Sequence, residues 1–135
     1  MLCNIQTINI VANNAVSISQ EVNANIQEAL ALIGVVEQQN KKTTIKQLEN
    51  LLIEYILANM RGDSGEARAI QGQIDQVIQT YERNLQQGNE LVAKLKAMET
   101  NPGVNPSADL AYLQSLIAAL KEDAASGDMS NLDQF

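Results

Sequence analysis

The sequence of 135 residues contains no histidine and no tryptophan, and only 3% of its residues are aromatic. Without histidine, the Ser-His and Cys-His pairs of common nucleophilic enzymes cannot form, and neither can the Glu-x-x-His pairs of di-iron bundles. The scarcity of aromatic rings leaves few platforms on which bases or sugars stack. We therefore expect no catalysis by these routes.

Cysteine is almost absent as well, since Cys3 is the only one. No intrachain disulfide can form, and metal sites built from thiolates or imidazoles are excluded. Asp128–Asp133 lacks the acidic alternation and the bidentate Glu of a calcium loop, and no glycine loop suits a phosphate. The acidic residues fall mainly on predicted solvent-facing sides of helices, whereas paired catalytic carboxylates need a cleft. The sequence predicts a protein without enzymatic activity, cofactor or metal.

Basic residues are few: nine Lys and Arg stand against sixteen Asp and Glu, which gives a net charge of -7. The nine are scattered, so a basic stripe for nucleic acid is lacking and an anionic membrane surface is disfavoured. A basic protein partner remains an alternative. The simpler interpretation is a surface whose like charges keep copies apart in solution.

Long apolar runs are also missing. No stretch approaches the roughly 20 residues that span a bilayer. The first residues lack the basic and continuous apolar regions of a secretory signal peptide. We predict no stable membrane span and no cleaved signal.

The chain does contain one long amphipathic stretch, Asp63–Thr100, which has no proline and predicts a single helix. Counted in sevens from Ala67, its apolar positions form three rows. The first row is Ala67, Ile74, Tyr81, Gly88 and Leu95; the second is Ile70, Val77, Asn84, Leu91 and Met98; the third is Ile78, Leu85 and Val92. Three positions in seven are typical of a helix inside a bundle, whereas two in seven indicate a two-stranded coiled coil. We therefore expect Ile78→Asp to bury an unpaired charge and to destabilise the bundle by several kcal/mol.

The N-terminal part predicts a second long helix up to about residue 39, preceded by a loose lead at residues 1–15 that is helical or disordered. A small hairpin around Asn13-Asn14 is the alternative for this lead. The polar segment Glu37–Thr44 predicts a break, after which Thr44 and Gln47 form a capping box. The following helix, Ile45–Met60, is apolar around most of its circumference. It is either the most buried helix of the bundle or a surface facing a second subunit.

The remaining boundaries follow from turn residues. Gly62 is placed to end a helix, Asp63 to cap the next one, and Asn105-Pro106 to open a last helix that Ser126-Gly127 ends. Residues 126–135 form a tail in which Ser130 is predicted to cap a further turn containing Leu132 and Phe135. We expect that the chain is truncated there or continues into another element.

These elements predict an all-α fold: an elongated antiparallel helical bundle of two long and two short helices, spanning residues 16–125. The packing order of the helices is left open.

Two asparagines interrupt the apolar rows, Asn25 and Asn84. A polar residue there fixes register and partner choice, or the row drifts and the asparagine turns outward; we favour the outward position. Gly88 allows close helix approach or local bending. The predicted positions of helix packing or partner contact are Leu52, Ile56, Ile74, Ile78, Tyr81, Asn84, Leu85 and Gly88.

The composition resembles that of secreted substrates of bacterial type III secretion, in particular filament and translocator proteins. The resemblance rests on the Ser-, Asn-, Gln- and Ile-rich start, NIQTINIVANNAVSISQ, on the near absence of Cys, Trp and His, and on the long polar-rich helices. It implies secretion without a cleaved signal peptide and function through helix–helix assembly.

The sequence thus predicts a non-catalytic helical protein that binds protein partners or itself. The resemblance implies a component or secreted substrate of a bacterial secretion apparatus; the alternative that we expect is a cytoplasmic chaperone or adaptor that receives a partner helix in a groove.

Overall fold

A computed structural model describes residues 2–135, with the side chains of residues 18–135. It contains three α-helices and one short 3-10 helix: α1 (Leu2–Met60), α2 (Ser64–Thr100), α3 (Pro106–Ser126) and η1 (Ser130–Gln134). No strand occurs in residues 2–135. The predicted all-α class is confirmed, but the arrangement of two long and two short α-helices is not found.

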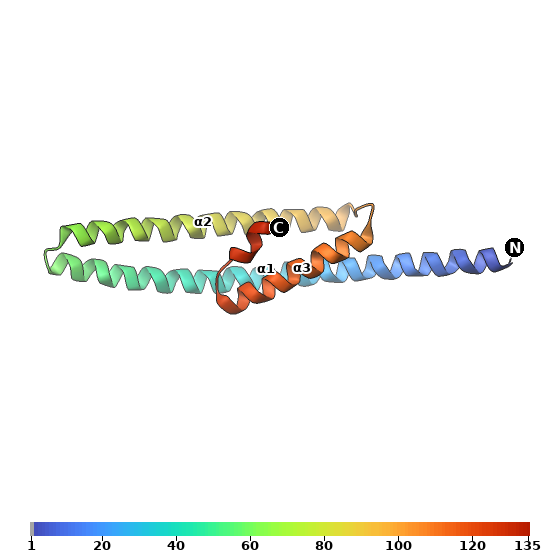
Figure 1. The fold of residues 1–135 in the computed structure, drawn as a ribbon, viewed down its shortest axis with the longest axis horizontal. Helices are drawn as coiled ribbons and strands as arrows, with labels where there is room; N and C mark the ends of the chain where they lie inside the picture. Colours follow the sequence, from blue (N-terminus) through green and yellow to red (C-terminus); the bar gives the residue numbers. More distant parts are fainter. Residues whose placement is uncertain (1) are drawn as a thin grey trace.

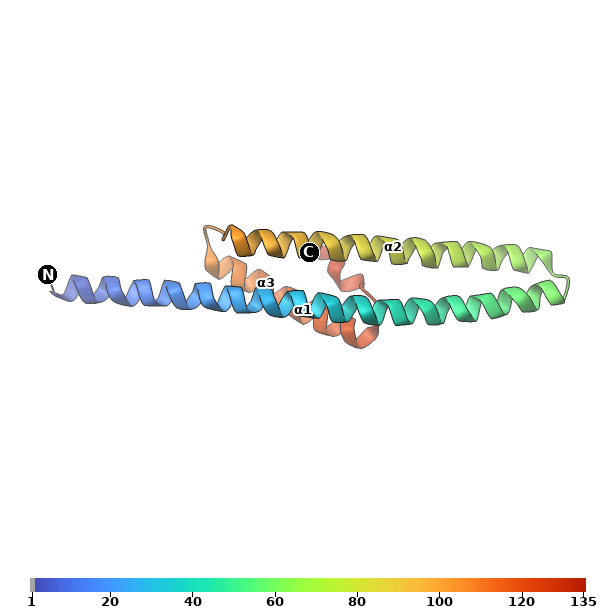
Figure 2. The ribbon, with the colours of Figure 1, turned by 180° about the vertical axis from the view of Figure 1, so that it is seen from behind.

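The two long helices form an antiparallel hairpin, and α3 lies diagonally across α1 (Figure 1). The chain then turns back, so that η1 reaches the C-terminal half of α2 (Figure 2). The N-terminal turns of α1 extend beyond the loop that joins α2 to α3. The result is an elongated molecule with three helices at one end of the hairpin and two at the other.

The predicted break at Glu37–Thr44 is wrong, because α1 continues through it without interruption. The segment contains neither glycine nor proline, and its Lys, Gln and Glu residues are good helix formers. Asn40 and Thr44 do not end or begin a helix; both side chains are buried against the rest of the fold. The polar side chains of this segment therefore do not indicate a turn; two of them, Asn40 and Thr44, pack inside the fold.

At the N-terminus the small hairpin around Asn13-Asn14 is not formed, since the backbone is helical from Leu2. The side chains of the predicted lead, residues 1–15, lie outside the described ones. The division between this lead and the bundle therefore stays a prediction.

The predicted N-caps at Asp63 and Asn105 are confirmed, whereas the capping box predicted at Thr44 and Gln47 is not formed because α1 continues through it. Asp63 accepts a hydrogen bond from the Glu66 N–H at 3.0 Å, and Asn105 accepts one from the Ala108 N–H at 3.3 Å. Gly62 and Gly127 have φ of 74° and 80°, a left-handed conformation that glycine adopts without a steric penalty. The further turn in the tail also forms, although Met129 rather than Ser130 precedes η1.

The hairpin divides into two regions, which we call the body and the arm. The body comprises residues 18–40 and 86–135, where α1, α2, α3 and η1 enclose one apolar core. Its buried members are Val22, Ile26, Ala29, Ile33, Val36, Leu91, Leu95, Leu113, Leu116, Ile117, Ala119, Leu120, Met129 and Leu132. The arm comprises residues 41–85, where α1 and α2 have only each other as partners. Its buried core consists of Ala58, Ala67 and Ile70.

In the arm, α2 buries two rows of its stripe rather than three. The first and second rows face α1, whereas Ile78 and Leu85 of the third row are exposed. A helix with one neighbour can cover only a narrow seam, which is the geometry of a two-stranded coiled coil. The predicted burial of Ile78 is therefore wrong, and so is the large effect expected of Ile78→Asp on that ground.

The segment Ile45–Met60 is not the most buried part of the fold. Ile45, Leu52, Ile53, Ile56, Leu57 and Met60 are all exposed. Only a narrow seam on this segment meets α2, and α3 ends before reaching the arm (Figure 1). The alternative interpretation, a surface facing a second subunit, stays a prediction.

Candidate association surface

Large apolar side chains gather on the surface of the arm. Eight of them are between 36% and 78% exposed: Ile45, Leu52, Ile53, Ile56, Leu57, Met60, Ile78 and Leu85. We call these eight residues the apolar patch. In the described part of the body, Val35 and Val104 are the only large apolar side chains that are exposed to a similar or greater extent. Single exposed aliphatic residues are normal on proteins, but a gathering of this size is typical of a contact surface.

The two helices contribute to the same side of the arm. Ile45 and Leu52 each follow a residue of the α1 seam, and Ile78 and Leu85 each follow a residue of the α2 seam. In an antiparallel helix pair, the positions that follow the seam on both helices lie on one flank. Asn84 contacts Asn40, and Gln71 contacts Tyr55. This register places Ile78 between Ile45 and Leu52, so the two rows form one apolar flank.

The other residues of the patch extend it around the outer face of α1. Ile53, Leu57 and Met60 are spaced four and three residues apart, which places them above one another on that helix. The patch is thus centred on α1 and includes the adjacent edge of α2.

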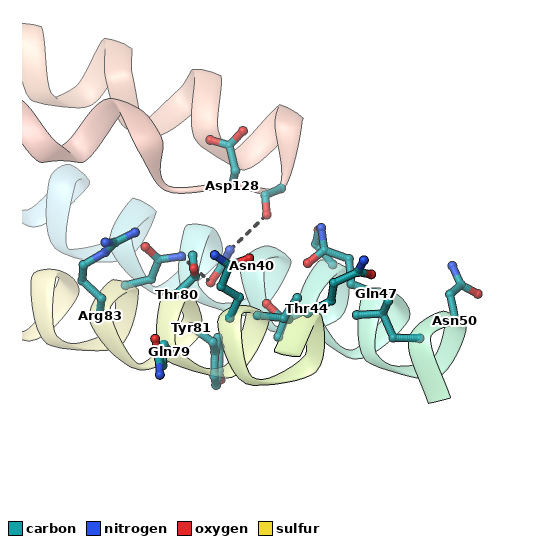
Figure 3. A pocket seen from close by; sticks show the side chains of 16 residues that line it. Asn40, Thr44, Gln47, Asn50, Gln79, Thr80, Tyr81, Arg83 and Asp128 are labelled. Carbon is teal, nitrogen blue, oxygen red and sulfur yellow. Dashed lines mark hydrogen bonds between the residues drawn. The ribbon is translucent and has the colours of Figure 1, made fainter. Parts of the chain in front are cut away.

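The opposite flank of the arm is polar. An open groove of about 830 Å³ lies there, and Gln47, Gln73 and Thr80, which precede seam residues, are among its lining side chains (Figure 3). Asn50, Gln76 and Arg83 also line it, and none of the eight patch residues does. The groove offers hydrogen-bonding groups without a cluster of like charge. The arm therefore has one apolar and one polar flank.

The groove ends where α3 meets the hairpin, and a chain of hydrogen bonds joins the three elements there. The Asn84 side chain donates to Asn40 Oδ1 at 3.3 Å, and the Asn40 side chain donates to the Gly127 carbonyl at 3.3 Å (Figure 3). Asn40 is buried and Asn84 is half-buried. We call Asn40, Asn84 and Gly127 the junction, because their hydrogen bonds connect the body with the base of the arm.

The structure separates the eight predicted contact positions into two groups. Leu52, Ile56, Ile78 and Leu85 are exposed and belong to the apolar patch. Ile74, Tyr81, Asn84 and Gly88 lie in the seam and face α1 instead. The eight predicted positions thus include residues of two kinds: those that pack α2 against α1, and those exposed on the apolar patch.

The two asparagines behave differently. Asn25 turns outward and bonds the Glu21 carbonyl of its own helix at 2.8 Å, as favoured from the sequence. For Asn84 the favoured outward position is wrong, because this side chain takes part in the junction. Gly88 is buried, and a Cβ there would meet the carboxylate end of Glu37, so this glycine makes room for an α1 side chain; the predicted close approach of the two helices stays a prediction.

Sequence reasoning missed Asn40 as a packing residue, and it missed Asp123. Asn40 follows Ile33 and Val36 at helical spacing, a signal that was available in the sequence. Asp123 is completely buried near the end of α3, where Asn131 donates to its Oδ1 at 2.8 Å and its Oδ2 has no hydrogen-bond partner. Burial raises the pKa of Asp123, and the charges of Asp128 and Glu122 add to this, while the Asn131 hydrogen bond opposes it.

Other contacts shape the tail, residues 126–135, and pack it against α2 and α3. The backbone N–H and hydroxyl of Ser130 donate to Asp128 and hold the pKa of that carboxyl below its ordinary value. The rings of Tyr112 and Phe135 pack edge to face with centroids 5.7 Å apart, and Lys94 Nζ lies 4.4 Å from the Tyr112 centroid. Residues 126–135 thus close the open side of the body between α3 and α2.

Among the described side chains, no group of three or more Cys, Asp or Glu residues is placed to hold a metal ion. Within residues 2–135, none of the helices combines the length and apolar character needed to cross a bilayer. Comparison of the chain with protein-family models, curated proteins and solved structures gives no match.

Proposed function

We propose that this protein is a non-catalytic helical protein that acts through helix–helix association, with the apolar patch of the arm as its contact surface. The observation that carries the proposal is the unequal burial of the two regions. Aliphatic side chains of the body are enclosed by three helices, whereas the eight of the patch are left uncovered by the same chain. When a partner covers exposed apolar surface of this kind, its removal from water stabilises the complex.

The proposed setting is a bacterial secretion apparatus, of which the chain is a component or a secreted substrate. Its support is the composition of the N-terminal stretch and the polar-rich helices, which resemble type III secretion substrates. The chain would then be secreted without a cleaved signal peptide. Deletion of residues 1–15 should abolish export while the body still folds, because the buried core residues among the described side chains all lie at or after Val22.

A cytoplasmic chaperone or adaptor is the second candidate. The apolar flank between α1 and α2 favours it, because a single amphipathic helix with apolar residues three and four positions apart can lie along such a row. A chaperone would remain inside the cell and co-purify with one defined client. An exported assembly protein would appear outside the cell and leave no stable client complex behind.

The test of the proposed function is mass measurement by light scattering after size separation, for the protein alone and after mixing with lysate of the producing cell. We expect a species heavier than one chain in at least one of the two conditions. Leu52→Lys should remove it, whereas Val35→Lys, at an equally exposed apolar position of the body, should not. A single-chain mass in both conditions would contradict the proposal.

A further inference from the structure

We propose that the covering partner of the apolar patch is a second copy of this chain, and that two arms pack side by side in antiparallel orientation to form a four-helix bundle. This inference rests on the proposed function and names its partner. Three observations lead to it: the distribution of charge, the amount of apolar surface and the order of charges along α1.

The arm is electrically neutral, although the chain as a whole carries -7. Residues 41–85 contain six basic and six acidic residues. The basic ones are Lys41, Lys42, Lys46, Arg61, Arg68 and Arg83; the acidic ones are Glu49, Glu54, Asp63, Glu66, Asp75 and Glu82. The whole net charge therefore resides outside the arm. Two arms do not repel each other, and a neutral arm of mixed charges has no preference for a strongly basic or acidic partner.

The amount of apolar surface suits a dimer. An aliphatic side chain of this size carries roughly 100 Å² of apolar surface, so eight of them at about half exposure present roughly 400 Å². A stable interface buries about 800 Å² on each partner, and somewhat more than half of this area is apolar. The patch thus supplies nearly all the apolar area that one side of such an interface requires.

The charges along α1 select the antiparallel orientation. The three basic residues Lys41, Lys42 and Lys46 lie at the base of the arm, and Glu49 and Glu54 follow toward its tip. A two-fold axis across the arm places the basic segment of one copy level with the acidic segment of the other. In a parallel pair, each charged residue would lie level with the same residue of the other chain, so like charges would face each other. A parallel pair would also bring the two acidic bodies together, whereas the antiparallel pair holds them at opposite ends.

The dimer closes on itself because its two surfaces are the same patch. Such an isologous contact gives a finite two-chain assembly rather than a filament. Ile45 and Leu52 of α1, which follow the seam, then occupy the interior of a four-helix bundle, where three positions in seven are apolar. The third row of α2, Ile78 and Leu85, is buried in the same interface. This accounts for an apolar stripe that is wider than the seam a lone hairpin buries.

The first experiment measures mass by sedimentation equilibrium over low- to high-micromolar concentrations of the purified chain. The expected result is a monomer–dimer equilibrium. Leu52→Lys and, separately, Ile78→Lys should each weaken the dimer by roughly a hundredfold, since the symmetric interface contains every substituted position twice. Val35→Lys is the matched control, because Val35 is 47% exposed and Leu52 is 50% exposed, and it should leave the dimer unchanged. Circular dichroism checks that each variant remains helical.

The second experiment measures orientation with a spin label at the exposed tip position Asn59. The variant is Asn59→Cys in a Cys3→Ser background, so that only one thiol per chain is labelled. In an antiparallel dimer the two labels lie roughly 25–35 Å apart, given a rise of about 1.5 Å per residue. In a parallel dimer they lie within about 15 Å of each other.

A dimer that both lysine substitutions dissociate, with the long label distance, supports the inference. A purified chain that remains monomeric overturns it, as does a dimer that Leu52→Lys and Ile78→Lys leave intact. A short label distance overturns the antiparallel arrangement. If the purified chain is monomeric but forms a Leu52-dependent complex with another helical protein, the inference fails while the proposed function stands. If the patch binds neither a second copy of the chain nor another protein, both the inference and the proposed function fail.

Discussion

The body and the arm are made from the same two helices, but α1 and α2 bury their apolar residues in one region and expose them in the other. The body encloses fourteen buried apolar core residues, and the arm encloses three. Local sequence does not explain this difference, since the arm is at least as rich in Ile and Leu. The difference is the number of neighbours: α3 and η1 cover the body, and no third element among the described residues covers the apolar patch of the arm.

Among substitutions that test the difference between body and arm, we expect the largest loss of stability in the body core. Leu116→Ala removes a side chain that is completely buried on α3, so it should lower the free energy of unfolding by about 3 kcal/mol. Urea denaturation followed by circular dichroism measures this change. Ile78→Ala in the arm is the control and should cost less than about 1 kcal/mol in dilute solution, because that side chain is partly solvated. Equal costs would contradict the division into body and arm.

A smaller effect is expected at the left-handed glycines, one in each region. Gly127→Ala should destabilise the fold by about 2 kcal/mol, because alanine resists φ of 80° and its Cβ would meet the Thr43 hydroxyl. Gly62→Ala at the tip of the arm has a similar φ but open space around it, so it should cost only about 1 kcal/mol. Thermal unfolding of both variants measures the difference. If Gly62→Ala were the more damaging, the tip would be packed more tightly than the junction.

At the junction we expect Asn40→Ala to destabilise the chain by about 1.5 kcal/mol. The substitution leaves the Gly127 carbonyl and the Asn84 amide without their partner. Asn25→Ala is the matched control, since Asn25 bonds only its own helix and is not part of the core. Urea denaturation should show little change for it. A negligible effect of Asn40→Ala would mean that the junction does not hold α3 against the hairpin.

The smallest effect concerns the buried carboxyl of Asp123, and it depends on pH. Because the folded-state pKa is raised by burial, the contribution of Asp123 to stability is fully present below the unfolded pKa and is lost as pH rises through the folded pKa. Asp123→Asn should therefore raise the free energy of unfolding by about 1 kcal/mol at neutral pH, and the gain should vanish in acid.

The control for Asp123 is Asp128→Asn, which should act in the opposite direction. The Ser130 donors lower the pKa of Asp128, so its contribution is present above the unfolded pKa and is lost as pH falls through the folded pKa. Denaturation curves at several pH values measure both variants. A constant difference between Asp123→Asn and the parent chain at all pH values would contradict the ionisation of Asp123.

Much of the fold was predictable from local patterns. The caps at Asp63 and Asn105 and the left-handed glycines were placed correctly, because these signals act within one helical turn. The break at Glu37–Thr44 was placed wrongly, because polarity alone does not end a helix, and this segment contains neither glycine nor proline. Asn40 bonds Asn84 and Gly127, which lie 44 and 87 residues away in the sequence.

The amino-acid sequence by itself determined the helical class, the long amphipathic rows and the turns, because these depend on spacings and on residues close in the chain. It also supplied the three-row stripe of α2. Only the tertiary structure decided which rows are buried, since burial depends on where α3 and η1 pack. That packing covers the stripe in the body and leaves Ile78 and Leu85 exposed beside Leu52 and Ile56 in the arm. The uncovered surface is the feature on which the proposed association rests.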